Sequence, residues 1–529
     1  MDADMKNKLQ EILARLYQNA GYSADPAKEA VSCIGQDAPQ LRQDLNVRIL
    51  KGGTYKIKGY YLEDNDLTDI RGASTIITQV QEKIIPDLLK KNVEFDCILY
   101  HGGGNLLALL PENCADDLGE QLEKCANRYL CTAQSAYFVS KPIALSDLLS
   151  KNYRTIMADN EATLEQRKKC KLIFEQAPKS NFLDQELFDG IKVRAAEVNS
   201  ADLCDCCKKR TASYRIEGKT VCGGCLHKIA VGKQQKNRYL DEYEKHTGCH
   251  PKEVHSISEI SDRNGDIALF YADGNNMGGI VANCKNLPDM MDFSAFVKSA
   301  MPTIVYDAIK ANAIDRFEIV ALGGDDVFLL VPADKAIRLA AKMIRLYQKK
   351  FQQKFPETNS TLSVGICIAK DSTPVQVMLE TAEEELDSAK ALVRQSETEI
   401  GGSLSFRILN TYEGSSADRG NTTLLPYSIE NAEKILDFSN QLQNQLHGDT
   451  MKTRLRNLSA AFHMADSTEE ASLFFQYTNA KESDEKKKIQ NLPSLDGYQS
   501  KNDGFYTKGS DKQSYYIWED LIDLVKYGK

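Results

Sequence analysis

Two adjacent aspartates, Asp325 and Asp326, stand between two apolar runs in the segment FEIVALGGDDVFLLVP, residues 317–332. Apolar runs on both sides of a short polar turn are typical of a hairpin of two buried strands. Gly323 and Gly324 give this turn a backbone freedom that other residues lack. Paired carboxylates at such a turn suit Mg²⁺, which takes oxygen ligands and usually bridges to phosphates. Because Asp and Gly are common turn residues, the motif alone leaves a plain acidic hairpin open.

A third aspartate with matching surroundings lies upstream, in DIALFYADGNNMGGI, residues 266–280. Its apolar run predicts another buried strand, and Asp273 follows at the end of that strand. Gly274 and Gly278 allow the backbone to approach a ligand closely. One aspartate that ends a strand, together with an aspartate pair on a neighbouring hairpin, is what a two-metal nucleotidyl-transfer site requires. We therefore predict a site for two Mg²⁺ or Mn²⁺ ions.

Four cysteines form two knuckles, Cys204-x-x-Cys207 and Cys222-x-x-Cys225, with fourteen residues between them. Four thiolates at this spacing suit a tetrahedral structural Zn²⁺ ion, and such a closed site has no open position for catalysis. The segment between the knuckles is polar, which argues against four unrelated buried cysteines. Other residues nearby could compete or substitute as ligands, namely Cys206, His246, Cys249 and His250.

The composition is that of an ordinary soluble globular protein, with 529 residues, 42% hydrophobic and 27% charged. The net charge of −9 does not predict nucleic-acid binding, although it does not exclude a local basic groove. No apolar run reaches the length of a membrane helix, and the acidic N-terminus lacks the apolar region of a secretion signal. Several of the fourteen cysteines stand singly in apolar stretches, which fits a reducing compartment, so we expect a cytoplasmic protein.

Five segments differ in their patterns. The first and last are predicted to be helical, the second and fourth mixed α/β, and the third a charged helical linker followed by the cysteine knuckles. The boundaries of these predicted domains are 1–45, 46–150, 151–260, 261–412 and 413–529. Helices are expected at 336–355, 374–394, 429–445, 452–466, 469–479 and 518–527, strands at 363–369 and 405–409, and a loop at 492–512.

The second segment contains a hairpin of the same outline as the central one. Residues 93–100 and 106–110 predict two strands around His101-Gly102-Gly103-Gly104-Asn105, so GGGN stands where the other hairpin has GGDD. We interpret the pair as an internal repeat with one degenerate copy, the alternative being chance similarity of two glycine-rich hairpins. Residues 57–62 predict a further strand, and 76–89 a helix that Pro86 kinks or ends early.

Three acidic residues, Asp64, Asp66 and Asp69, precede Arg71-Gly72-Ala73-Ser74. They could be metal ligands, but no carboxylate hairpin is expected opposite them, so a solvated loop is the preferred interpretation. On the helix predicted at 374–394, Lys390 and Arg394 lie one turn apart and could face phosphates, although a solvated basic edge fits the spacing equally well.

GGDD after an apolar strand, preceded by ADGNNMGG, resembles the polymerase-like large subunit of type III CRISPR effector complexes. The resemblance covers roughly residues 46–529 and includes, in the order found in that family, RGAS, the GGGN hairpin, the knuckles, SVGICIA, LDSAK and YYIWEDLIDLV. GGDD alone is less specific, because bacterial cyclic-dinucleotide synthases carry related hairpins. The ordered combination is much more specific.

The resemblance implies an α+β multidomain chain with two ferredoxin-like palm domains of the nucleotidyl-cyclase type. A helical insert would hold the zinc ribbon, and a helical domain would end the chain. The first palm would be inactive, and the second would join ATP molecules into cyclic oligoadenylates when target RNA pairs with a guide RNA held by sister subunits. The two palms are expected to pack face to face with nucleotide between them.

Particular residues take roles from this resemblance. Asp273 and Asp325 are implied as metal ligands, with Asp326 also at the metals, and Lys390 as a contact to the triphosphate. The ions would position a 3′-hydroxyl against the α-phosphate of a second nucleotide and neutralise charge on the leaving pyrophosphate. The residues assigned to nucleotide binding are Gly274, Asn275, Gly278, Gly323, Gly324 and Lys390.

The chain departs from the family pattern in three ways. Its seven histidines include no His-Asp pair, so DNA cleavage by the histidine–aspartate nuclease domain of many members is not expected. Asn275 stands where the family often has an aspartate, and a neutral amide is a weaker Mg²⁺ ligand. The chain is also short for the family, so its contacts with other subunits could be reduced.

Two other functions remain open at this point. One is a different transferase on the same scaffold, either a cyclic-dinucleotide synthase or an adenylyl transferase that uses a non-nucleotide acceptor. The other is a non-catalytic nucleotide-binding scaffold subunit of an RNA-guided complex. Three retained carboxylates argue against the scaffold. Base preference, product size, activator and oligomeric state are not determined by the sequence.

Overall fold

The computed structural model divides the chain into two compact units. The first comprises Met1–Arg238, Asn276–Pro302 and Val320–Asp325, and the second comprises Tyr239–Asn275, Thr303–Ile319 and Asp326–Lys529. The structure describes residues 3–36, 39–61, 63–64, 66–170, 196–198, 201–234, 238–396, 400–409, 423–445, 449–482, 489, 492–501, 503–508 and 514–528.

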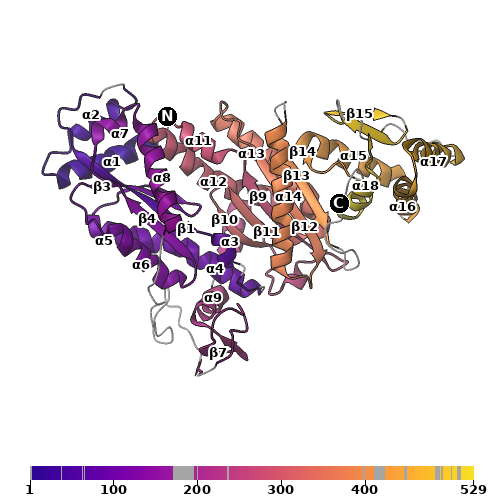
Figure 1. Cartoon of the computed structure of the whole chain (residues 1–529), viewed down its shortest axis with the longest axis horizontal. Coiled ribbons are helices and arrows are strands. Elements are labelled where there is room, and N and C mark those ends of the chain that lie inside the picture. The colour runs from indigo at the N-terminus through magenta and orange to yellow at the C-terminus, as the bar shows by residue number, and fades with distance from the viewer. Residues whose placement is uncertain are drawn as a thin grey trace. The chain divides into compact units, whose positions relative to one another are not determined.

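A five-stranded antiparallel sheet organises the first unit (Figure 1). Its order is β2-β3-β1-β4, and the short strand β5 also pairs with β1. The strands are β1 (Asn46–Tyr55), β2 (Ile98–Gly102), β3 (Asn105–Pro111), β4 (Gln134–Val139) and β5 (Ile143–Ala144).

Helices cover both faces of this sheet, which explains why β3 is a continuous apolar run and does not alternate with polar residues. Leu50 and Ala108 pack into the core on one face, while Ile49 and Leu107 pack into the core on the other. The first core includes α4 (Leu67–Gln79), α5 (Ile85–Val93) and α6 (Leu118–Leu130), and the second includes α1 (Ala3–Asn19), α2 (Pro26–Ser32), α7 (Leu145–Leu149) and α8 (Tyr153–Cys170). The helices predicted near the N-terminus are thereby confirmed.

One prediction in this region was wrong, and one strand was missed. The strand expected at 57–62 is the short helix α3 (Ile57–Tyr61), and the strand that was missed is β1. The sequence of β1 is interrupted by Gly52 and Gly53, which normally weaken a strand. Here they allow close approach, because a Cβ on Gly53 would lie 1.7 Å from the carbonyl oxygen of Gly104.

The helix expected at 76–89 is a composite of three helical segments. The end of α4 passes through a π-helical turn, η1 (Val80–Ile84), into α5. Pro86 lies in the first turn of α5, where its missing N–H is tolerated. Pro86 therefore begins a helical segment and does not end one.

The cysteine-rich part of the first unit has little regular structure of its own. It contains the three-stranded sheet β6 (Ala196–Glu197), β7 (Tyr214–Ile216) and β8 (Lys219–Val221), followed by α9 (Gly223–Gln234). The backbones of α9 and α4 are in contact where the two helices cross. A Cβ on Gly72 would lie 1.9 Å from the Lys228 carbonyl oxygen, and a Cβ on Gly232 would lie 1.9 Å from the Thr68 carbonyl oxygen. This crossing is a packing reason for the glycine of the RGAS segment.

The solvated loop expected around Asp69 was wrong for Asp69 itself. Asp69 lies in the first turn of α4 and is only 1% exposed. Burial, and then the nearby Asp64, raise the pKa of Asp69 to about 8. Asp66 caps α4, since its carboxylate accepts a hydrogen bond from the backbone N–H of Thr68 at 2.9 Å.

The second unit contains most of a six-stranded sheet with the order β10-β11-β9-β12-β13-β14. The strand sequence β10-β11-β9-β12 repeats the order β2-β3-β1-β4 of the other sheet. Strands β11 and β12 both pair antiparallel with the central strand β9, and β13 pairs parallel with β12. The strands are β9 (Asp266–Gly274), β10 (Glu318–Gly323), β11 (Asp326–Pro332), β12 (Leu362–Lys370), β13 (Gly402–Ile408) and β14 (Tyr427–Ser428).

Helix α14 (Val375–Gln395) lies along β12 and β13 of this sheet, as Figure 1 shows in orange. The glycine of SVGICIA permits this contact, because a Cβ on Gly365 would lie 2.1 Å from the Ala382 carbonyl oxygen. The predictions of this helix, of the preceding α13 (Ala336–Lys354) and of strands β12 and β13 are confirmed. The other helices between residues 238 and 335 are α10 (Arg238–Thr247), η2 (Ile257–Glu259), α11 (Met277–Asn283), α12 (Leu287–Ala311) and η3 (Ala333–Lys335).

The C-terminal part of the second unit is helical around the buried Trp518, which packs against Phe462 and Phe475. All four predicted helices occur, as α15 (Ile429–Gln445), α16 (Asp449–Met464), α17 (Thr468–Lys481) and α18 (Trp518–Tyr527). The loop expected at 492–512 was wrong, since it holds strands β15 (Tyr498–Lys501) and β16 (Phe505–Lys508), which form a sheet with β17 (Ser514–Tyr515). Among the described helices, none combines the length and apolarity needed to cross a membrane.

Candidate nucleotide-binding and zinc sites

Asp273 and Asp326 lie at the same edge of the second sheet. In the antiparallel pair of β9 and β11, Val327 is opposite Ala272, so continuing this register by one residue places Asp326 opposite Asp273. Asp273 is half-buried near the end of β9, and Asp326 is the exposed first residue of β11. Two carboxylates on adjacent strand ends can bind one cation between them, or bind two neighbouring cations.

A positively charged side chain lies against one of these carboxylates. The ammonium group of Lys390, on α14, forms an ion pair with Asp273. Only 17% of the Lys390 side chain and 23% of the Asp273 side chain are exposed. The sequence interpretation placed Lys390 toward phosphates, whereas here its ammonium lies against Asp273, the carboxylate that the same interpretation assigned to a metal ion. Asp273 therefore accepts positive charge.

Tyr271 supports Asp326 from the neighbouring strand. Its hydroxyl donates a hydrogen bond to Asp326 Oδ1 at 3.3 Å. Burial raises the pKa of Tyr271 well above its usual value, and the charges of Asp326 and Asp273 raise it further. The phenol therefore stays protonated and remains a donor throughout the physiological pH range.

Asn275 uses its side-chain amide within the second unit. Its Nδ2 donates to Thr361 Oγ1 at 2.8 Å and to Ser363 Oγ at 2.9 Å, and its Oδ1 lies 3.1 Å from the Ser363 hydroxyl. The side chain is buried, and the register of β12 places Ser363 opposite Asp273. In this arrangement Asn275 holds the end of β9 against β12. The nucleotide contact expected from the sequence stays a prediction.

The remaining hairpin residues lie in the first unit. Gly324 and the half-buried Asp325 form the turn between β10 and β11, and Gly324 has the left-handed φ of +62° that favours glycine. The tip of the GGGN hairpin touches this turn, because a Cβ on Gly103 would lie 3.1 Å from Gly324 Cα and 3.7 Å from the Gly323 carbonyl oxygen. Gly274 is the buried last residue of β9, whereas a Cβ on Gly278 in α11 would meet nothing within 4 Å.

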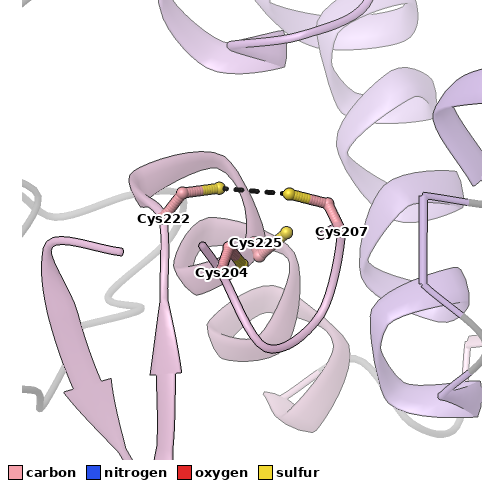
Figure 2. A group of neighbouring side chains, drawn as sticks. All are labelled: Cys204, Cys207, Cys222 and Cys225. Atoms are coloured by element: carbon pink, nitrogen blue, oxygen red, sulfur yellow. Dashed lines mark hydrogen bonds between the residues drawn. The ribbon is translucent and has the colours of Figure 1, made fainter. Parts of the chain in front are cut away.

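The predicted zinc ligands are gathered in one cluster. Figure 2 shows the four buried cysteines of the two knuckles around a common centre. The sulfur atoms of Cys207 and Cys222 are 3.9 Å apart, close to the roughly 3.8 Å edge of a tetrahedron with Zn–S bonds of about 2.3 Å. The donor set and its spacing therefore fit a structural zinc ion. Among the described residues this cluster does not include the alternative ligands His246, Cys249 and His250.

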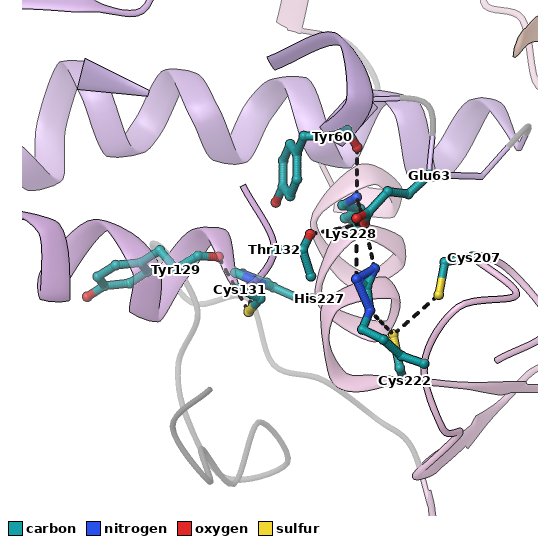
Figure 3. Close-up of polar contacts among 10 residues, drawn as sticks. Tyr60, Glu63, Tyr129, Cys131, Thr132, Cys207, Cys222, His227 and Lys228 are labelled. Carbon is teal, nitrogen blue, oxygen red and sulfur yellow. Dashed lines mark hydrogen bonds and ion pairs between the residues drawn. The ribbon is translucent and has the colours of Figure 1, made fainter. Parts of the chain in front are cut away.

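Charged residues connect this cluster to the first sheet's helices (Figure 3). Arg210 Nε donates to the sulfur of Cys222 at 3.5 Å, and Arg210 also pairs with Glu63 at 2.8 Å. The buried Lys228 donates to Glu63 at 2.6 Å and to the Tyr60 carbonyl oxygen at 2.8 Å. Thr132 donates to the same carboxylate at 3.0 Å. Glu63 thus ties α9 and the knuckles to the chain that follows α3.

Sequence reasoning missed Tyr271, Ser363 and Glu63. Tyr271 stands in an apolar run and looks like a core residue, so only its place two residues before Asp273 could have signalled a role at the site. Ser363 is adjacent to Asp273 only because β12 pairs with β9. Glu63 has no motif around it.

A family description of the second palm domain of Cas10/Cmr2 matches residues 266–397. This range runs from the start of β9 through α14 and includes Asp273, the GGDD turn and Lys390. Residues 266–397 are therefore similar to this domain. A comparison with curated proteins finds no match for the chain.

Solved structures of Csm1 share the fold over most of the chain. A Csm1–Csm4 cassette in complex with pppApA gives a TM-score of 0.56 at 13% identity, over 87% of this chain and 67% of that one. Csm1 from T. onnurineus gives 0.55 at 13% identity, over 86% and 66%. A Csm1–Csm4 subcomplex of the type III-A CRISPR-Csm interference complex gives 0.56 at 13%, over 86% and 68%. The chain spans about two thirds of the length of these Csm1 chains. At this identity the structural similarity establishes only the fold. The similarity of residues 266–397 to the Cas10/Cmr2 palm rests on the family match.

Proposed function

We propose that this chain is the cyclase subunit of a type III CRISPR effector complex and joins ATP into cyclic oligoadenylates. The observation that carries the proposal is the placement of Asp273 and Asp326 on adjacent strand ends inside the segment that matches the Cas10/Cmr2 second palm domain. Similar Csm1 chains have been crystallised with Csm4 and with pppApA, cA4 and ATP, which supports adenine nucleotides as ligands. Csm4-like and guide-RNA-bound subunits are the proposed partners.

On this proposal the chain contains two ferredoxin-like palms, of which only the second keeps the carboxylates. The common strand order of the two sheets supports this interpretation. The four-cysteine cluster would hold a structural zinc ion within the linker between them.

Asp273, Asp325 and Asp326 would hold the Mg²⁺ or Mn²⁺ ions. When bound, such ions lower the pKa of a hydroxyl and neutralise charge on a leaving pyrophosphate. Tyr271 keeps the carboxylate of Asp326 oriented through its hydrogen bond. Lys390 would leave Asp273 and turn to the triphosphate. Its ammonium group would thus pair with Asp273 when no nucleotide is bound, and with the triphosphate when nucleotide binds. The bond from O3′ to Pα forms as the bond from Pα to the pyrophosphate oxygen breaks, and the hydroxyl proton goes to solvent.

The test is incubation of the purified chain with ATP and Mg²⁺ or Mn²⁺, with and without RNA-bound partner subunits, followed by mass spectrometry of the products. Asp325→Asn is the matched inactive variant. A cyclic oligoadenylate that disappears in Asp325→Asn supports the proposal. Equal product from the variant contradicts the assigned site, and a cyclic dinucleotide or an adenylylated acceptor in its place would indicate the other transferases.

A non-catalytic nucleotide-binding scaffold is the second candidate, and two observations favour it. Lys390 already compensates the charge of Asp273, and Asn275 directs its amide to Thr361 and Ser363. If the scaffold is correct, nucleotide binds in the presence of partners, but no metal-dependent product forms with any nucleoside triphosphate.

A further inference from the structure

A second group of potential metal ligands lies within the first unit, beside the four-cysteine cluster. It consists of Asp64, Asp69 and Cys206, and one carboxylate oxygen of each aspartate and the Cys206 sulfur all lie within 4.8 Å of one another. Cys206 is the spare thiol of the first knuckle and is buried, as is Asp69. Asp64 precedes α4 and Asp69 lies in its first turn, so the group joins this helix to the knuckle.

Asp69 is the decisive member of the group. It is 99% buried, and its Oδ1 atom has no hydrogen-bond partner among the described residues. A carboxylate placed out of water is costly unless it is paired, hydrogen-bonded or bound to a metal. Within the described part of the chain, Asp69 Oδ1 therefore lacks the partner that a buried carboxylate needs, and a bound cation would supply it.

Nearby basic side chains are engaged with other groups. Lys228 pairs with Glu63 at 2.6 Å and donates to the Tyr60 carbonyl oxygen. Lys219 pairs with Asp66 at 3.2 Å, and Arg210 pairs with Glu63 and contacts Cys222. In these contacts the three basic side chains pair with groups other than Asp69.

We propose that Asp64, Asp69 and Cys206 bind a second zinc ion next to the four-cysteine cluster. A thiolate together with two carboxylates suits the borderline-soft Zn²⁺, whereas Mg²⁺ prefers oxygen ligands alone. Three protein ligands leave a fourth position for water. The ion would fasten the start of α4 to the knuckle, alongside the Gly72 crossing of α4 and α9. The proposal does not depend on cyclase activity.

The test is the zinc content of the purified full chain, measured by inductively coupled plasma mass spectrometry after saturation with zinc and removal of free metal. The wild type is expected to hold two zinc ions per chain. Asp69→Asn and Cys206→Ser should each reduce the content to one, because the four cysteines of the other site are unchanged. The matched control is Cys249→Ser, which removes a thiol from the second unit and should keep two ions.

Asp64→Asn is a milder variant, since Asp64 is half-buried and less important for packing than Asp69. It should also reduce the content to one ion, with an unchanged far-ultraviolet circular dichroism spectrum. Replacement of zinc by Co²⁺ gives a second readout, because loss of the single-thiolate site should remove only part of the sulfur-to-cobalt absorption. One zinc ion in the saturated wild type, or two in all three ligand variants, would overturn the proposal.

Discussion

The two hairpins of this chain have the same place in sheets of the same strand order, but they differ in chemistry. The register that puts Asp326 opposite Asp273 in the second sheet puts Asn105 opposite Gly53 in the first. Both carboxylates are thus absent from the first sheet. The strand order is thus the same in both sheets although an amide and a glycine stand in the first where the second has two carboxylates. In the first sheet Gly53 instead serves packing, because the Gly104 carbonyl oxygen lies where a side chain would begin.

The largest effect is expected from Asp273→Asn, which keeps the shape but removes the charge. Losing several kcal/mol of metal-dependent stabilisation of the transition state should lower the rate of product formation on the order of a thousandfold. The rate is measured by chromatography of the products formed from ATP and Mn²⁺. Asp334→Asn in η3 is the matched control and should leave the rate unchanged. A rate for Asp273→Asn within tenfold of the wild type would remove this residue from the site.

Gly53→Ala tests the packing role of the first sheet. A Cβ at this position would lie 1.7 Å from the Gly104 carbonyl oxygen, so the backbone must shift, and overpacking of this kind should lower the free energy of unfolding by about 2–3 kcal/mol. Hydrogen exchange of the β1 amides in urea measures the loss. Gly59→Ala is the control, because a Cβ on Gly59 meets nothing within 4 Å. Equal stability of both variants would show that Gly53 is not required for packing.

Much of this contrast was visible in the sequence, but not all of it. The GGDD and GGGN hairpins, the upstream Asp273 and the cysteine knuckles are local patterns, and local patterns determine turns and strand ends. The pairing of β9 with β12, which brings Ser363 opposite Asp273, depends on tertiary structure and has no signature in the chain. The same is true of β1, whose glycines looked unfavourable until their neighbours were known. It is also true of the burial of Asp69, which the acidic segment around it did not indicate.

Lys390→Met separates the two roles of this lysine. If the ammonium moves from Asp273 to the triphosphate, its loss should raise the KM for ATP about tenfold, as expected for a charged hydrogen bond worth about 1.5 kcal/mol. The metal concentration needed for half-maximal rate should fall, because the competing cation is gone. Steady-state kinetics at varied ATP and Mg²⁺ measure both changes. Arg394→Met is the control, since Arg394 is exposed one turn away on α14, and an identical effect there would favour a general basic edge.

Tyr271→Phe is expected to have a smaller effect. It removes one hydrogen bond of 3.3 Å to Asp326 without changing the ring, and a loss of about 1 kcal/mol should slow turnover by roughly fivefold. Because the pKa of Tyr271 is raised, the wild type and the variant should have pH–rate profiles of the same shape between pH 6 and about 9. A variant that loses turnover completely would show that the hydroxyl does more than orient Asp326.

The smallest effect is expected from Asn105→Asp, which restores an acidic residue to the first hairpin. The opposite position is still Gly53, so a single carboxylate should not create a metal site, and product formation should stay within about twofold of the wild type. The same chromatographic assay measures it. A clear gain of activity, or a gain of bound Mn²⁺, would mean that the first sheet lacks only one ligand.

On the proposed function, the second hairpin holds metal and nucleotide and the first does not. The most direct test is Mn²⁺ binding by electron paramagnetic resonance, with a non-hydrolysable ATP analogue present, in the wild type, Asp273→Asn and Asn105→Asp. We expect nucleotide-dependent Mn²⁺ binding in the wild type and in Asn105→Asp, and its loss in Asp273→Asn. Undiminished nucleotide-dependent Mn²⁺ binding by Asp273→Asn would show that the second hairpin does not hold the metal through Asp273.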